Sequence, residues 1–280
     1  MTAVLFLCTS AAQAQSNTTT IVTTTTTTIT TTNNVTTTNV TTTVTTNAPK
    51  PKIVVKTNGW KTSVAVGLTI ARGNTDSTQA SITGSTQKKW LQNSLIFESD
   101  ALYGESRVPS QTKQQETAEV LHGYSQYDRV FGDRFYGYGR IDGFHDGIAD
   151  IKYRLTLAGG LGYYFVTNKT MDVMGEIGPG YIDEKLDDHA ETIYVTLRIA
   201  EKLHYIISPN AKAWETIEFL PQVDHFNNYI ANAELGVEAK LTKGGKLSLR
   251  SVLQDNYYNV PAPGRLKNDL KLITSVVYNF

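Results

Sequence analysis

The chain has 280 residues, and its 26 basic and 26 acidic residues give a formal net charge of zero. This balance offers no excess positive charge for a nucleic acid, so we expect no nucleic-acid partner. Fifteen tyrosines and 21 glycines against three methionines favour a strand-rich protein with tight turns. No run of 18 apolar residues follows the N-terminus, which excludes a helical membrane span but not a membrane barrel, whose alternating strands dilute the mean hydropathy.

Residues 1–14, MTAVLFLCTSAAQA, hold a short apolar core followed by Ala12-Gln13-Ala14, the small-x-small pattern of a cleavage site. They predict a secretory signal peptide that is cut after Ala14. The only cysteine, Cys8, lies inside this segment. The mature chain is therefore predicted to contain no disulfide and no thiolate metal site.

Within residues 15–58, threonine dominates residues 18–46, and a Pro/Lys-rich stretch follows at 48–52. Such low complexity has no period that builds a packed core, so it predicts a disordered periplasmic tether. Threonine also favours extended pairing. A plain spacer is the simpler interpretation, and a segment that is O-glycosylated or contacts the cell wall is the alternative.

From Trp60 to Phe280 apolar and polar residues alternate with a period of two, and turn residues interrupt the alternation. We therefore predict that residues 59–280 form an all-β fold, an antiparallel up-and-down transmembrane β-barrel of about 12 strands, most of them long enough to cross a bilayer when tilted. The expected strands cover 60–71, 77–87, 94–106, 116–129, 134–144, 153–165, 171–182, 191–205, 213–223, 229–241, 246–257 and 269–280.

The predicted connections alternate in length along the chain. Short turns at 129–133, 166–170, 207–210 and 242–245 fall on one side, and longer loops at 107–115, 145–152, 183–190 and 259–268 fall on the other. Short periplasmic turns with longer surface loops are typical of outer-membrane barrels. Aromatic residues near the strand ends, among them Trp60, Phe165, Trp214 and Phe280, are expected to form interfacial girdles.

The final strand, DLKLITSVVYNF, places Leu272, Val276, Tyr278 and Phe280 on one face and ends on an aromatic residue. This pattern resembles the C-terminal assembly signal of bacterial outer-membrane barrels. It implies that the last strand engages the barrel-assembly machinery.

Several motifs resemble those of one family. They are Gly73-Asn74-Thr75, Tyr127-Asp128-Arg129, YRLTLAGGLGYYF at 153–165 and GEIGPGYID at 175–183. Together they resemble the salt-induced outer-membrane protein family, a bacterial β-barrel family catalogued as a domain of unknown function. The resemblance covers residues 60–280, and Gly160–Tyr164 with Gly178–Tyr181 carry most of it. It implies a place in the bacterial cell outer membrane and supplies no catalytic residue.

Charged side chains that are predicted to face the barrel interior are the candidates for function: Arg140, Asp142, Arg154, Glu176, Arg198, Glu234, Glu238, Lys240, Arg250 and Lys271. They would either line a narrow pore for small solutes or pair with one another and fill the lumen, because a buried charge needs a partner. About twelve strands leave both possibilities open. The first function class is thus a pore or uptake channel. The alternative is a non-conducting structural or stress-response envelope protein that acts through its loops or tether.

An enzyme is not expected. Acid–histidine neighbours occur at His145-Asp146, Asp188-His189 and Asp224-His225, but polar loop residues are often adjacent and no serine lies in a nucleophile setting. A weak metal candidate is the loop DEKLDDH, because Asp183, Glu184, Asp187 and Asp188 carry hard oxygen ligands. A solvated acidic loop is the simpler interpretation. No cofactor is predicted, and the expected partners are outer-membrane lipid, the assembly machinery and the cell wall.

Overall fold

The computed structural model describes residues 20–32, 35–47, 59–71, 76–107, 115–187 and 189–280. The predicted signal peptide, with Cys8 and the cleavage site at Ala14, lies outside the described residues. The chain divides into two units, Met1–Lys52 and Ile53–Phe280, and each is described by itself. None of the described residues belongs to a helix that is long and apolar enough to cross a membrane.

The threonine-rich unit contains two paired strands. β1 (Thr20–Thr32) and β2 (Val35–Asn47) form an antiparallel two-stranded sheet whose register runs from Thr20 opposite Asn47 to Thr32 opposite Val35. This differs from the disorder that low complexity predicts, because the β-branched side chain of threonine favours extended backbone.

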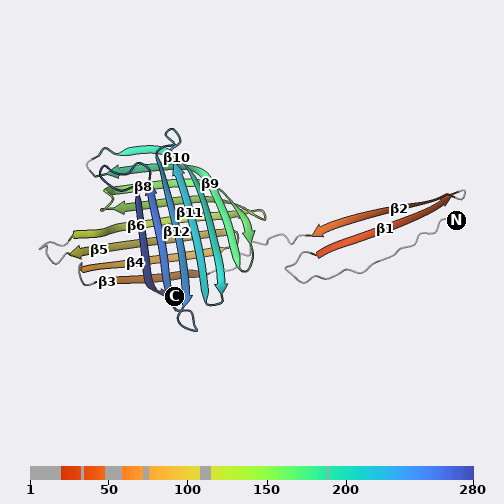
Figure 1. The fold of residues 1–280 in the computed structure, drawn as a ribbon, viewed down its shortest axis with the longest axis horizontal. Coiled ribbons are helices and arrows are strands. Elements are labelled where there is room, and N and C mark those ends of the chain that lie inside the picture. Colours follow the sequence, from red (N-terminus) through yellow and green to blue (C-terminus); the bar gives the residue numbers. More distant parts are fainter. Residues whose placement is uncertain (1–19, 33–34, 48–58, 72–75, 108–114, 188) are drawn as a thin grey trace. The chain divides into compact units, whose positions relative to one another are not determined.

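The second unit is a closed barrel of twelve strands in which each strand pairs antiparallel with the next and β14 returns to β3. The strands are β3 (Trp60–Ala71), β4 (Asp76–Trp90), β5 (Asn93–Arg107), β6 (Gln115–Phe131), β7 (Phe135–Asp146), β8 (Ile151–Thr167), β9 (Met171–Leu186), β10 (Thr192–Ser208), β11 (Ala211–Pro221), β12 (Tyr229–Lys240), β13 (Leu247–Tyr258) and β14 (Asn268–Asn279). In Figure 1 the blue and cyan strands of one wall cross the orange and yellow strands of the wall behind, as tilted barrel strands do. The predicted fold is confirmed.

The two faces of the wall differ in the way that the alternation predicts. On β8, Leu155 is 41% exposed and its neighbour Arg154 is 9% exposed; on β12, Val237 is 44% exposed and Glu238 is 5% exposed. Apolar side chains therefore cover the outside while polar ones are buried inside, the reverse of a soluble protein. Trp214 is an exception to the predicted aromatic girdle, because it shares the inward parity of Glu218 on β11 and contacts Gly236 inside the barrel.

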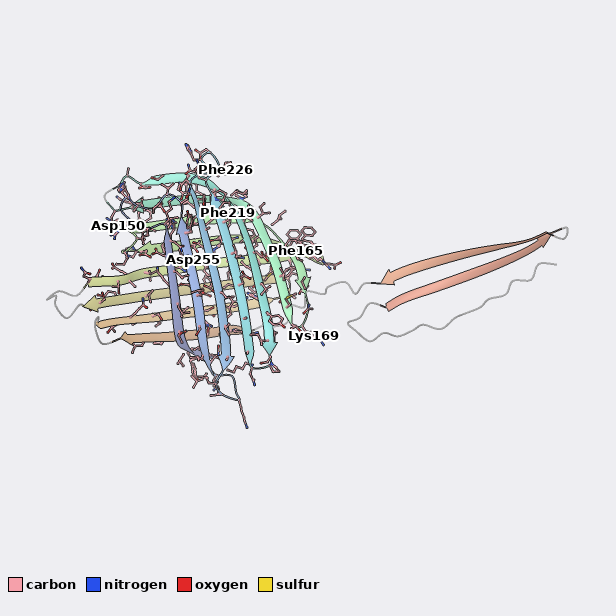
Figure 2. All side chains as sticks on the ribbon, viewed as in Figure 1. Asp150, Phe165, Lys169, Phe219, Phe226 and Asp255 are labelled. Carbon is pink, nitrogen blue, oxygen red and sulfur yellow. The ribbon has the colours of Figure 1, made fainter. Side chains whose placement is uncertain are left out.

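The two ends of the barrel carry different connections. Short turns at 91–92, 132–134, 168–170, 209–210 and 241–246 join the strands at what we call the turn end. The connections at 147–150, 222–228 and 259–267 lie at the opposite loop end. Figure 2 shows Asp150, just before β8, and Lys169, just after it, at these opposite ends. The connections at 222–228 and 259–267 follow the predicted sorting, whereas 147–150 is shorter than the turn at 241–246.

The seam that closes the barrel is short. Among the described residues, the register between β14 and β3 comprises four pairs, from Val276 opposite Val66 to Asn279 opposite Ser63. One further backbone bond joins them, from the Phe280 N–H to the Thr62 carbonyl at 2.9 Å. The first and last strands therefore meet at the turn end of the barrel, next to the C-terminal residue.

Glycines on the inward face make room for large side chains. A Cβ at Gly162 of β8 would lie 2.1 Å from Cζ of Tyr136, and a Cβ at Gly236 of β12 would lie 2.1 Å from the Trp214 ring. The aromatic rings thus lie flat over bare backbone on neighbouring strands. This packing fills part of the lumen with side chains.

Candidate functional site

The centre of the lumen is organised around Glu176 of β9. Its two carboxylate oxygens accept hydrogen bonds from Gln126 Nε2 at 2.9 Å, the Tyr136 hydroxyl at 2.9 Å, Arg198 Nη1 at 2.7 Å and Lys202 Nζ at 2.8 Å. The donors come from β6, β7 and β10, and Glu176 is only 3% exposed. Four donors, two of which are cations, satisfy this buried carboxylate, as burial of a charge requires.

Arg198 carries the interactions onward from Glu176. Its Nε donates to Glu218 Oε1 of β11 at 2.5 Å, and the second oxygen of Glu218 accepts from Asn232 Nδ2 of β12 at 3.2 Å. Arg198 is 1% exposed, so its guanidinium is held between two carboxylates without access to water. We call this set the lumen network; its members are Gln126, Tyr136, Glu176, Arg198, Lys202, Glu218 and Asn232.

A second group of charges joins β5, β6 and β7. Both ring nitrogens of His122 face carboxylates, with Nδ1 2.8 Å from Asp100 Oδ1 and Nε2 3.1 Å from Asp142 Oδ2. Asp142 also accepts from Arg140 Nη2 at 2.7 Å, and the Arg140 guanidinium lies 3.8 Å from the centre of the Tyr124 ring. An imidazolium would satisfy both aspartates through its two N–H groups. This group touches the lumen network, because Arg140 Nη1 is 3.5 Å from Gln126 Oε1.

A third group lies on β11, β12 and β13. Glu238 accepts from Arg250 Nη2 at 2.9 Å and lies 3.2 Å from Lys212 Nζ. Glu234 accepts from Trp214 Nε1 at 2.6 Å and from Gln254 Nε2 at 3.1 Å. Each carboxylate of this group therefore has two donors from neighbouring strands.

At the loop end, one ion pair and one cation–ring contact span the barrel. Lys271 of β14 donates to Asp146 of β7 at 3.0 Å, although four strands lie between them on one side and six on the other. Arg154 of β8 pairs with Glu184 and also lies over the ring of Tyr258 of β13, 4.7 Å from its centre. These contacts bring opposite walls together.

Apolar side chains pack inside the same end of the barrel. We call them the mouth cluster: Ile151, Ile182, Tyr194, Leu220, Ile230 and Tyr258, with Phe144, Ala149 and Leu186 against them. The six core members are between 0% and 8% exposed. A passage for polar solutes would not be expected to hold such a group, because apolar constrictions exclude water.

An exposed ion pair links two loops above the mouth cluster. Arg265, between β13 and β14, donates from Nε and Nη2 to the two oxygens of Asp150, between β7 and β8, at 2.5 and 2.8 Å. This fork-to-fork geometry is the strong form of a salt bridge. The hydrogen bond from Arg265 lowers the pKa of Asp150, and the same bond raises the pKa of Arg265.

Nine of the ten predicted interior charges take part in these groups. Lys240 does not, because it is exposed at the end of β12 and its ammonium donates to the Pro209 carbonyl of a turn. Inward parity therefore does not bury a side chain at the barrel rim. The sequence analysis missed several partners, namely Asp100, His122, Gln126, Tyr136, Lys202 and Glu218. The alternation along each strand could have identified them. Lys202, for example, lies four residues after Arg198 and therefore faces the same side of β10.

The described acids after Tyr181 do not gather at one point. Asp183 and Glu184 belong to β9, where successive side chains point to opposite faces, and Glu184 pairs with Arg154 inside. Asp188 lies outside the described residues. Among the residues that are described, no group of three or more potential ligands could hold a metal ion.

Of the three histidines next to an acid, His145 belongs to β7 while His189 and His225 lie in connections, and each bonds to a nearby group. His145 Nδ1 is 2.9 Å from the Lys152 carbonyl, and His189 Nδ1 is 2.7 Å from the Asp187 carbonyl. His225 lies 3.3 Å from Asp224, and both are exposed. The Asp224 carboxylate has a lowered pKa, chiefly because Gln222 donates a hydrogen bond to it.

Several solved barrels are similar to this chain. A NanC porin is 6% identical, with 78% of this chain and 98% of that chain covered and a TM-score of 0.45. The translocator domain of the autotransporter NalP from Neisseria meningitidis is 12% identical, with 80% and 90% covered and a TM-score of 0.42. The outer-membrane channel DcaP of Acinetobacter baumannii is 10% identical, with 79% and 96% covered and a TM-score of 0.39.

A comparison with curated proteins finds no match. A family model described as "Protein of unknown function, DUF481" matches residues 64–280. These residues include the barrel from β3 onward and all the charge groups described above. The chain therefore belongs to this DUF481 family.

Proposed function

We propose that this protein is a β-barrel of the bacterial outer membrane. The closed strand order supports this location, because a spanning structure must satisfy its backbone groups internally. The apolar outer wall supports it as well, with Leu161 55% exposed and Leu235 53% exposed on different strands. In water, so much exposed apolar surface would cause association.

We infer further that the lumen is occluded and that the protein is a non-conducting envelope protein. The observation that carries this inference is contact across the lumen: Lys202 Nζ of β10 lies 3.2 Å from Gln126 Oε1 of β6, and Lys271 reaches Asp146. Charges that pair wall to wall hold the barrel shut rather than offer sites to a moving ion. The mouth cluster adds an apolar layer at the loop end.

Conductance in planar bilayers tests this proposal. We expect purified, refolded protein to give no current steps beyond those of protein-free bilayers. A faster-migrating band in unboiled gel samples would show that the barrel is folded in the same preparation. Regular current steps from protein with that band would contradict the proposal, and their ion selectivity would then report on the lumen charges.

A second candidate function is a narrow pore that opens under salt stress. It is favoured by the exposed pair between Asp150 and Arg265, because ionic strength screens exposed ion pairs most. The salt connection in the resembling family is consistent with this idea. Two results together would favour this pore. Wild-type protein would give current steps in about 1 M salt but not in about 0.1 M salt, and Arg265→Gln would give current steps already in about 0.1 M salt.

The remaining expected roles follow from the same location. The exposed face of Leu272, Val276 and Tyr278 with the exposed Phe280 is proposed to engage the barrel-assembly machinery. The threonine-rich unit is proposed to act as a periplasmic tether, with the cell wall as its candidate partner. We propose no catalytic activity and no cofactor.

A further inference from the structure

Two glutamates face outward from neighbouring strands of the barrel. Glu201 of β10 lies opposite Ile217 of β11, and Glu215 of β11 lies opposite Leu203 of β10. The two carboxylates are therefore diagonal neighbours on one face of the sheet, a separation that long side chains can bridge. Both side chains are exposed.

Their surroundings are apolar. On the outward face of β10, Ile199 precedes Glu201, and Leu203 follows it. On the other side of Glu215, the facing residue of β12 is Leu235, which is 53% exposed. Glu201 is the tenth of the 17 residues of β10, and Glu215 is the fifth of the 11 residues of β11. The two acids therefore interrupt the apolar outer band away from the strand ends.

Neither glutamate has a partner within the part of the chain that the structure describes: no hydrogen bond or ion pair joins Glu201 or Glu215 to another described side chain. The inward acids differ, since Glu176, Glu218 and Glu238 each pair with a cation. Other outward acids, among them Glu119, Asp183 and Asp255, lie toward the loop-end termini of β6, β9 and β13, and Figure 2 marks Asp255 on its strand. Glu201 and Glu215 lie further from the loop end and are diagonal neighbours on adjoining strands, with no partner among the described residues.

We propose that the outward surface around Glu201 and Glu215 is a contact surface for another membrane protein that presents an arginine or lysine at the same depth. This inference rests on the proposed membrane location. Ionisable groups that face hydrocarbon are costly and mark functional contacts, since only neutralisation or a partner removes the cost. The inward acids are paired with basic residues of this chain. A basic side chain of another protein would pair with Glu201 and Glu215 in the same way.

A second copy of this chain does not fit the surface. Two copies that met face to face would place four carboxylates together, and like charges repel. The outward basic residues on the described strands, Lys88, Arg129 and Lys185, lie within a few residues of the ends of β4, β6 and β9. They would not reach the depth of Glu201. The occupant is therefore a different polypeptide.

Model peptides in vesicles test this surface. The full-length barrel, labelled with a fluorescent donor, is refolded into lipid vesicles with a hydrophobic helical peptide of about 20 residues that carries an acceptor and one central arginine. A matched peptide has leucine in place of the arginine. We expect the arginine peptide to bind about tenfold more tightly, the preference that a polar contact in a membrane gives. The double variant Glu201→Gln/Glu215→Gln is expected to bind both peptides equally, while Asp255→Asn keeps the preference.

Three results would overturn the proposal. Equal binding of the two peptides by wild-type barrel would show that the acids do not select a cation. Energy transfer between two labelled barrels that the double variant abolishes would make a second copy the occupant. Failure of the barrel to insert, read from the absence of a faster-migrating unboiled band, would overturn the membrane location as well. Insertion without a preference would overturn the contact surface alone.

Discussion

Lys271 of β14 and Asp146 of β7 meet across the lumen, with 3.0 Å between Nζ and Oδ2. Asp146 is 2% exposed, and its other oxygen accepts the backbone N–H groups of Ile148 and Ala149. One carboxylate thus shapes the connection after β7 and attaches it to the opposite wall. The pair couples the loop-end mouth to the strand that closes the barrel.

Replacing Lys271 by methionine is expected to lower the free energy of unfolding by about 1–3 kcal/mol, because Asp146 would remain buried without its cation. Adding Asp146→Asn removes the unpaired charge, so the double variant should be less destabilised than the sum of the two single variants. Urea unfolding in lipid vesicles, followed by tryptophan fluorescence, measures all three. Strict additivity would show that the two side chains do not interact.

Arg198 and Lys212 form a matched pair of tests for the inward charges. Arg198→Met leaves Glu176 and Glu218 without their shared guanidinium, so we expect a loss of about 3–5 kcal/mol in the free energy of unfolding. The Lys212 side chain is 54% exposed, and its partner Glu238 keeps Arg250. Lys212→Met should therefore cost at most about 1 kcal/mol. Similar losses in the two variants would mean that burial does not govern the strength of these pairs.

Much of the fold could be predicted from the period of two, because a barrel wall with an apolar outside and a polar inside repeats that pattern on every strand. The alternation of Leu155 and Arg154 or of Val237 and Glu238 needs no knowledge of distant residues. The contacts of Lys271 with Asp146 and of Lys202 with Gln126 could not be predicted. They depend on how far the strands tilt and on which residues face each other across the lumen. Lys240 shows the same limit, since parity gives direction but not depth.

Gly162 is expected to be intolerant of a side chain. A Cβ there would lie 2.1 Å from the Tyr136 ring, whose hydroxyl donates to Glu176. Gly162→Ala should therefore displace the ring and lower the free energy of unfolding by about 1–3 kcal/mol. Gly139→Ala is the control, because nothing lies within 4 Å of a Cβ at that position. Tyr136→Leu combined with Gly162→Ala should recover part of the loss, and no recovery would place the clash elsewhere.

The pair between Asp150 and Arg265 should make the loop-end contact sensitive to acid. The hydrogen bond from Arg265 holds the pKa of Asp150 below its usual range. A depressed pKa stabilises the contact above the ordinary aspartate pKa of about 3.9, and this stabilisation is lost as the pH falls through the lowered value. Spin labels on the two loops would report a larger separation in acid than at neutral pH. Arg265→Gln should show that larger separation at both pH values, and a pH-independent distance in wild type would contradict the prediction.

Deletion of Phe280 should prevent stable closure of the barrel. Its N–H donates to the Thr62 carbonyl at 2.9 Å, and its ring packs edge-on against Tyr278 with 4.9 Å between centroids. Because the register of β14 with β3 comprises only four pairs among the described residues, loss of an adjacent bond removes a large part of the seam. We expect the shortened chain to lose the faster-migrating unboiled band and to be depleted from the outer-membrane fraction. Phe226→Ala is the control, since that ring is 66% exposed in a loop and should leave both readouts unchanged. A shortened chain that still migrates as a folded barrel would show that the four pairs suffice.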